Sequence, residues 1–197
     1  MPKMGITGLK DVTLTPIVTN TAEKYETSAT GQIAIPYVKS MTRTVKETSQ
    51  DFYYDDDLYA SAKDVTGEEF EMRFAEIPLK TLADLGLGEY DEDTNSLEAN
   101  FNVIGKDYAL NCVCNTISNL PYFLRWRQCT ISSITFDNLN TRGDSLAICE
   151  AIVKGTFAKP LCTKAHPYVM RVATDAASIT AGETWLKAAE TITTTAA

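Results

Sequence analysis

Carboxylates gather in two short segments of the sequence. Asp55, Asp56 and Asp57 stand between aromatic residues in FYYDDDLYASA, and a second group, DEDTNS, spans residues 91–96. Carboxylate oxygens are ligands that calcium prefers, but neither segment has the glycine-containing twelve-residue spacing of an EF-hand loop. We therefore interpret both segments as solvated acidic loops and predict no metal site.

Thiols and the single histidine offer a second kind of chemistry. Cys112 and Cys114 are one residue apart, whereas zinc sites favour a gap of two to four residues and a second ligand pair. Cys162 could pair with His166 as a nucleophilic dyad, but the sequence offers no residue to orient the imidazole. Phosphate-binding and hydrolase motifs do not occur. We predict no enzyme, no cofactor, and cysteines that are reduced and mostly buried.

Two arginines stand close together in YFLRWRQ. In a strand, Arg125 and Arg127 would share one face, and Leu124 and Trp126 would share the other. The arginine face is either a simple exposed strand face or a contact for acidic partners. Because the chain has a net charge of -8, a neighbouring copy of the same protein is a candidate partner. Arg125 and Arg127 are therefore candidate inter-subunit contacts.

Composition limits the class of protein. The 197 residues, 44% of them apolar and 22% charged, fit a single globular domain over 1–197. The acidic excess opposes binding to nucleic-acid phosphates and anionic membranes. No apolar run reaches the roughly 18 residues of a membrane helix, and the start lacks the apolar core of a signal peptide. We expect a protein kept in the cytoplasm, with no membrane partner.

Period-two alternation predicts a mainly β fold. In EEFEMRFAEI, over 68–77, three apolar residues alternate with Glu69, Glu71 and Arg73, as a half-buried strand requires. Alternation also predicts a hairpin over 98–115 that turns at Gly105 and Lys106. Further strands are expected over 122–128, 129–137 and 146–157, the last apolar on both faces.

Helices and extensions complete the predicted organisation. PLKTLADLGLG predicts a short helix over about 78–87 that packs on the sheet, and a second helix is predicted over about 181–190. Residues 1–50 read as an extended N-terminal arm with the first strands, 51–175 as the β core, and 176–197 as a C-terminal extension. Both ends are polar, so we expect neighbouring copies to order them.

The order of these segments resembles a known family. GLKDVTLTPI over 8–17 is followed by the aromatic-Asp element over 54–59, then by the amphipathic strand over 68–77 and the Leu-rich helix over 79–88. This order resembles the major tail tube proteins of tailed bacteriophages with long non-contractile tails (siphophages), particularly those of Gram-positive hosts. The resemblance covers roughly the first half of the chain and, beyond it, only the β-rich character.

The resemblance implies a β-sandwich or β-barrel core with a short flanking helix. Six such subunits form a ring, and rings stack into a tube whose inner wall is a β-barrel shared by all six copies. Double-stranded DNA passes through the tube without specific binding. The implied partners are the protein itself, a tape measure protein, a tail terminator and distal tail proteins. The implied location is the virion tail, with assembly in the host cytoplasm.

Two hypotheses about residues follow. DNA carries one charge per about 1.7 Å of axis, so a basic lining would trap it and a neutral or acidic lining would let it slide. We therefore expect Glu69 and Glu71 to face the lumen. We also expect 55–57 to dock on an adjacent subunit, near Arg125 and Arg127.

Two alternative functions stay open. A tube subunit of a contractile tail or of a phage-tail-like bacteriocin would share the fold and the assembly. A carbohydrate-binding β-sandwich module would display an aromatic platform, for which Tyr53, Tyr54 and Tyr59 are the clustered candidates.

Overall fold

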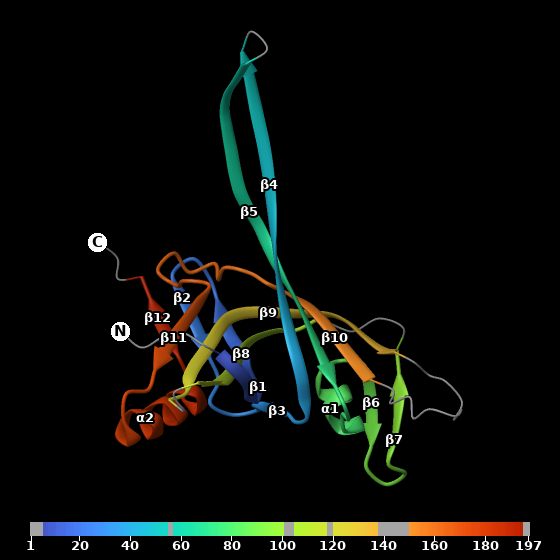
Figure 1. The fold of residues 1–197 in the computed structure, drawn as a ribbon. Coiled ribbons are helices and arrows are strands. Elements are labelled where there is room, and N and C mark those ends of the chain that lie inside the picture. The colour runs from blue at the N-terminus through green and yellow to red at the C-terminus, as the bar shows by residue number, and fades with distance from the viewer. Residues whose placement is uncertain (1–5, 55–56, 101–104, 118–119, 138–149, 195–197) are drawn as a thin grey trace.

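The computed structural model describes residues 6–54, 57–100, 105–117, 120–137 and 150–194. Its main feature is an antiparallel sheet of ten strands, in the order β12-β2-β1-β8-β9-β10-β5-β4, with β3 beside β1 and β11 beside β9 (Figure 1). These strands are β1 (Ile6–Asn20), β2 (Lys24–Thr27), β3 (Ile33–Ile35), β4 (Val38–Tyr54), β5 (Asp57–Phe74), β8 (Asp107–Thr116), β9 (Tyr122–Asp137), β10 (Glu150–Phe157), β11 (Tyr168–Val172) and β12 (Thr191–Thr193).

The remaining elements are short. α1 (Leu79–Asp84) and the two-stranded sheet of β6 (Gly88–Asp91) and β7 (Ser96–Ala99) follow β5, and α2 (Ala176–Lys187) precedes β12. The mainly β class and the short helix after Pro78 are confirmed. Within the described ranges, the ten strands do not close into a barrel, because β4 and β12 stand at opposite ends of the strand order.

The larger core lies on one face of the sheet. The alternation predicted for β5 is confirmed, because Phe70, Met72 and Phe74 are all buried. They pack with alternate residues of β1, β8, β9 and β10, and with Leu82 and Leu85 from the segment of α1. Residues 151–153 are all buried, as predicted for a strand covered on both faces.

α2 covers the opposite face, where β8 and β9 contribute Val113 and Phe123. A β-carbon on Gly182 would lie 2.2 Å from the Phe123 ring, so the helix approaches the sheet as closely as glycine permits. The helix begins about five residues before the predicted start. Asp175 caps it by accepting a hydrogen bond from the backbone N–H of Ser178, in a capping box with serine where glutamate is usual.

Several strand predictions need correction. The predicted hairpin over 98–115 is wrong, because β7 pairs with β6 and β8 pairs with β1 and β9. The two strands predicted over 122–128 and 129–137 are one strand, β9, since no turn residue interrupts them. Alternation reports which residues share a face, but it does not report which strand lies alongside.

The chain ends also differ from the predicted extensions. β1 lies within the sheet beside β8, and its Val12 and Leu14 are buried. β12 pairs with β2, so the last described strand also belongs to the sheet. The long projection is instead the hairpin of β4 and β5, whose outer part stands clear of the body (Figure 1).

Candidate functional site

The projecting ribbon is the first candidate site, and we define it as residues 46–54 of β4 and 57–67 of β5. β4 and β5 pair from Val38 opposite Phe74 to Tyr54 opposite Asp57, but β10 accompanies β5 only from Phe74 to Glu68. The pairing shifts register where β5 leaves β10, between Lys46 and Glu47. A bulge bends and twists a strand pair. The ribbon therefore leaves the sheet at a built-in bend.

Both edges of the ribbon are open. Among the described strands, β4 pairs only with β5, and β5 has no second partner from Asp57 to Gly67. An isolated two-stranded hairpin is marginally stable in water. An unpaired strand edge is also a template for pairing with another chain. The ribbon thus combines low intrinsic stability with two edges that no other described strand covers.

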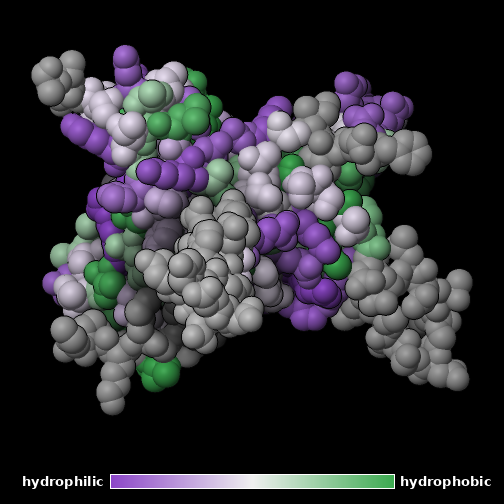
Figure 2. Space-filling view, turned by 90° about the horizontal axis from the view of Figure 1, so that it is seen from above, coloured by the Kyte–Doolittle hydropathy of each residue, from purple (hydrophilic) through white to green (hydrophobic). Residues whose placement is uncertain are grey.

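A polar face surrounds the base of the ribbon, on the side of the sheet away from the larger core. Glu69 lies 2.6 Å from the Lys46 ammonium, and Glu71 accepts from Arg73 at 2.8 Å. The Lys154 ammonium lies 3.3 Å from the second Glu71 oxygen. These bonds from Lys154 and Arg73 hold the pKa of the Glu71 carboxyl below its ordinary value. Figure 2 shows hydrophilic residues around this base, seen from above.

The polar face is balanced in charge. Glu150 belongs to the same row, where it pairs with Lys39 and lies 3.6 Å from Arg73. Each of Glu69, Glu71 and Glu150 therefore has a basic partner. The acidic excess lies elsewhere, since residues 88–99 of the β6–β7 hairpin carry five carboxylates and no basic residue.

Arg125 is buried, with 1% of its surface exposed, and is used within the chain. Its guanidinium donates to the Asn111 side chain at 2.7 Å and to the carbonyls of Trp185, Leu186 and Ala188 at 3.0 to 3.2 Å. These carbonyls belong to the C-terminal end of α2, where a cation is favoured. Burial lowers the pKa of Arg125, against the effect of the nearby Glu190 carboxylate.

Arg127 is 7% exposed and forms a two-pronged ion pair with Glu190, at 3.0 and 2.8 Å. Its remaining nitrogen donates to the carbonyl of His166. The two arginines do share a face, as predicted, but the expected exposure of that face is wrong. α2 and the segment before β12 cover it, so both side chains tie the C-terminal segment to the sheet.

Other predicted site residues lie partly or wholly outside the described structure. Asp55 and Asp56 are outside the described residues, and Asp57 is described only as the first backbone position of β5. The side chains of Tyr53, Tyr54 and Tyr59 are also outside the description. The structure therefore leaves the docking loop and the aromatic platform as predictions.

The thiols that the structure describes are packing residues. Cys112, Cys114, Cys129 and Cys162 are buried, as predicted, while Cys149 lies outside the described residues. Burial raises the pKa of the Cys129 thiol, which opposes formation of a nucleophilic thiolate. Cys162 packs against Tyr25 and Ala165 and points its thiol at the carbonyl of Ile192, at 3.9 Å. In the part of the chain that is described, no three metal-ligating side chains gather.

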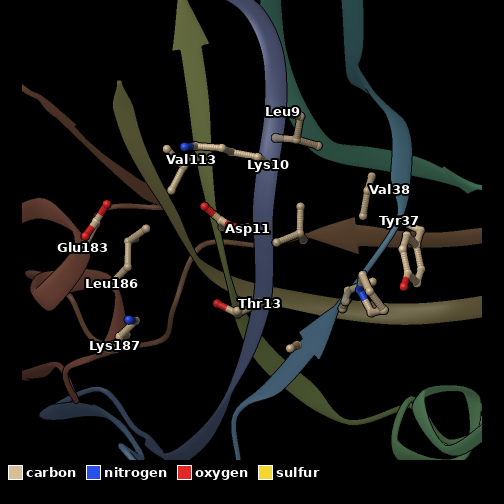
Figure 3. Close-up of a pocket in the computed structure, with 14 residues that line it drawn as sticks. Leu9, Lys10, Asp11, Thr13, Tyr37, Val38, Val113, Glu183, Leu186 and Lys187 are labelled. Carbon is tan, nitrogen blue, oxygen red and sulfur yellow. The ribbon is translucent and has the colours of Figure 1, made fainter. Parts of the chain in front are cut away.

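Sequence patterns did not predict a groove of about 700 Å³ across β1 (Figure 3). α2 supplies Glu183, Leu186 and Lys187 on one side, and Tyr37 lies on the other. Asp11 and Tyr37, both in the lining, have positive φ angles of 51° and 59°. Asp11 lies where the register of the β1–β8 pair shifts, between Lys10 and Thr13. A positive φ angle is common at such a bulge. The lining mixes apolar residues with charges of both signs and contains none of the predicted site residues.

No family model matches the chain, and no curated protein matches it. Neither described helix is long and apolar enough to cross a membrane.

Proposed function

We propose that the protein is a structural virion subunit that polymerises into the tail tube of a bacteriophage, as stacked hexameric rings that conduct DNA into the host. The observation that carries this proposal is the projecting ribbon with two open edges. The six-fold symmetry and the phage context follow from the sequence resemblance of the first half of the chain.

Self-assembly accounts for a ribbon that the single chain does not stabilise. At about 3.3 Å per residue, the part of β4 beyond Lys46 is roughly 26 Å long. Soluble proteins shorten, cover or charge their edge strands to prevent such pairing. An edge of this length therefore favours a protein whose strands are completed by other copies.

The polar face at the ribbon base supports the lumen hypothesis in a modified form. Glu69 and Glu71 stay the lumen-facing candidates, but their partners Lys46, Arg73 and Lys154 make the face balanced rather than acidic. Basic groups held by carboxylates are less available to phosphates. A tube lined by this face would let DNA slide.

The docking hypothesis is also modified. Asp55, Asp56 and Asp57 stay candidates for contact with an adjacent subunit. Arg125 and Arg127 do not, because both side chains are buried and bound within the chain. Donation from these guanidiniums to a neighbour's carboxylates would require α2 to leave the sheet.

Electron microscopy of the purified protein tests the proposal. Negative-stain images of the concentrated full chain should show tubes or stacked rings. A matched control replaces residues 47–66 with Asn-Gly, a two-residue hairpin turn that joins the paired Lys46 and Gly67. This control should keep the denaturant midpoint of the body and lose the tubes. A full chain that stays monomeric at high concentration would contradict the proposal.

A further inference from the structure

The groove across β1 lies beside a strand edge that no other described strand covers. β8 pairs with one edge of β1 from Ile6 to Pro16. On the other edge, β3 pairs only with residues 12–14, and β2 pairs only from Ile17 onward. An uncovered edge offers its backbone hydrogen-bonding groups to another strand. The part of β1 before Val12 is therefore open to a further strand in line with β3.

The sequence after β3 explains why this edge is open. Pro36 directly follows Ile35 and has no N–H to donate to β1. Tyr37 then adopts a φ angle of 59°, and Val38 pairs with Phe74 of β5 instead of with β1. A positive φ at a bulky residue is uncommon and strained. The chain therefore turns away from β1 at a strained residue, and the groove occupies the space beyond the end of β3.

Four ionisable side chains line the groove and are not used within the chain. Lys10 and Asp11 come from β1, and Glu183 and Lys187 come from α2 (Figure 3). All four are exposed, and among the described residues none of them forms an ion pair or a side-chain hydrogen bond. Each wall of the groove therefore carries one positive and one negative charge that a ligand can pair with.

A bulge places both charges of β1 in the groove. Neighbouring residues of a regular strand face opposite sides of the sheet. Between Lys10 and Thr13, however, β1 has one residue more than β8, and such a bulge re-aims a side chain. Val12 belongs to the larger core, whereas Lys10 and Asp11 both lie on the side of β1 that faces α2 (Figure 3). The two opposite charges are therefore adjacent along the open edge.

We propose that the groove binds an extended peptide segment of another protein, which adds as a strand to β1 beside residues 8–11 and continues the line of β3. In this mode of recognition, backbone hydrogen bonds give affinity and alternate side chains give specificity. The inference goes beyond the proposed function and does not depend on it.

The two sides of the groove define the chemistry of the segment. Toward the larger core the segment meets Leu9, Ile35 and Val38, so alternate residues should be apolar. Toward α2 it meets charges of both signs, so the residues between should be charged, with both signs present. Because β1 lines the groove from Leu9 to Thr13, about five residues, roughly 17 Å of strand, span it.

The room beside β1 favours a segment of another protein over a second copy of this chain. Tyr37 and Val38 bound the groove on the side away from α2 (Figure 3). A strand that kept a sheet partner of its own would bring that partner, about 4.8 Å further on, against them. Every described strand of this chain has such a partner. The groove therefore fits a single strand, which the described elements of this chain do not offer.

Fluorescence polarisation with a defined probe tests the inference. The probe is the fluorescein-labelled peptide VEVKVEVK, which alternates valine with charges of both signs, and it should bind the full-length protein saturably. Two further versions are N-methylated at alternate residues, so that each loses the donors of one strand edge. At least one of them should bind about tenfold more weakly, or worse. Absence of saturable binding of VEVKVEVK up to about 1 mM, or equal binding of all three peptides, would overturn the inference.

A variant of the groove provides a matched measurement. Neutral side chains at its four charged positions should weaken binding of the probe about tenfold and leave the circular dichroism unchanged, because these side chains are exposed: Lys10→Gln, Asp11→Asn, Glu183→Gln and Lys187→Gln. A control with the same net charge alters four exposed positions elsewhere and should bind like the wild type: Lys80→Gln, Glu92→Gln, Asp93→Asn and Lys106→Gln. Equal binding of the probe by the two variants would contradict the charge argument.

Self-association distinguishes the possible occupants. The groove variant should self-associate like the wild type in sedimentation equilibrium. Loss of self-association in this variant would assign the groove to a second copy and overturn the inference. Probe binding by a wild type that never builds tubes would support the inference and contradict only the proposed function.

Discussion

The C-terminal segment and the projecting ribbon both lie at the margin of the main sheet. Contacts within the chain hold the first, whereas the second has few such contacts. The C-terminal segment, 175–194, is held by buried groups of its own chain, among them Arg125, Arg127 and Phe123. In the ribbon, each strand pairs only with the other among the described strands, and the outer part stands clear of the body (Figure 1).

The difference shows where each region finds its partners. Sequence patterns predicted that the C-terminal extension, 176–197, and the loop at 55–57 depend on neighbouring copies, and they placed the rest of 51–67 in the β core. In the structure, the C-terminal segment is part of the folded body, because its carbonyls and the Glu190 carboxylate accept hydrogen bonds from Arg125 and Arg127. No other described strand covers the edges of the ribbon, so assembly stays the expected source of its stability.

The largest expected effect comes from removing the central carboxylate of the C-terminal segment. Glu190→Leu leaves the Arg125 and Arg127 guanidiniums buried without their common carboxylate. We expect a loss of about 3 kcal/mol in the free energy of unfolding. Urea denaturation measures it, and Glu183→Gln, an exposed change on α2, should stay within about 0.5 kcal/mol. Equal free energies of unfolding for the two variants would show that Glu190 does not hold the C-terminal segment on the sheet.

A smaller effect with an unusual sign is expected at Gly182. Alanine normally stabilises a helix interior relative to glycine by about 1 kcal/mol. At Gly182 the added methyl group would overlap the Phe123 ring, and overpacking costs about 1–3 kcal/mol. Gly182→Ala should therefore lower the denaturation midpoint.

The matched control for Gly182 is Ala181→Gly, at the exposed neighbouring position. It should also destabilise, but through helix propensity alone, by about 1 kcal/mol. A stabilising Gly182→Ala substitution would place α2 farther from the sheet than the structure does.

Acid should weaken the polar face at the ribbon base by a still smaller amount. The pKa values of Glu71 and Glu150 are lowered from 4.5, chiefly by Lys154 and by Lys39 respectively. Because the folded pKa is the lower one, these carboxylates stabilise the protein above about pH 4.5, and this contribution is lost as the pH falls through the folded values. Stability measured from pH 6 to pH 3 should fall less steeply in a Glu71→Gln, Glu150→Gln variant. Identical slopes for the variant and the wild type would contradict the ion pairs of Glu71 and Glu150.

The smallest effect is expected where the ribbon leaves the sheet. A β-carbon on Gly67 would have nothing within 4 Å. Gly67→Ala should therefore change the free energy of unfolding by no more than about 0.5 kcal/mol. The difference in unfolding free energy between Gly67→Ala and Gly182→Ala measures how much more tightly α2 is packed than the base of the ribbon. A large loss at Gly67 would mean that the ribbon base is packed in the single chain.

Local patterns predicted the parts of the fold that depend on neighbouring residues. The alternation of Phe70, Met72 and Phe74 gave the buried face of β5, and Pro78 with its leucines gave α1. The partner of β8 could not be predicted, since an alternating strand fits many partners equally well. The groove beside Tyr37 had no sequence signal, because segments far apart in the chain form it.

The sequence by itself determined which side chains share a face, including Arg125 and Arg127, because the period of a strand is set by its own backbone. Only the tertiary structure decided that this face is covered while the edges of the ribbon are open. Covering a face depends on contacts between distant segments, here the end of α2 and Glu190 with β9. Such contacts are selected by the packing of the whole chain, and no local spacing encodes them.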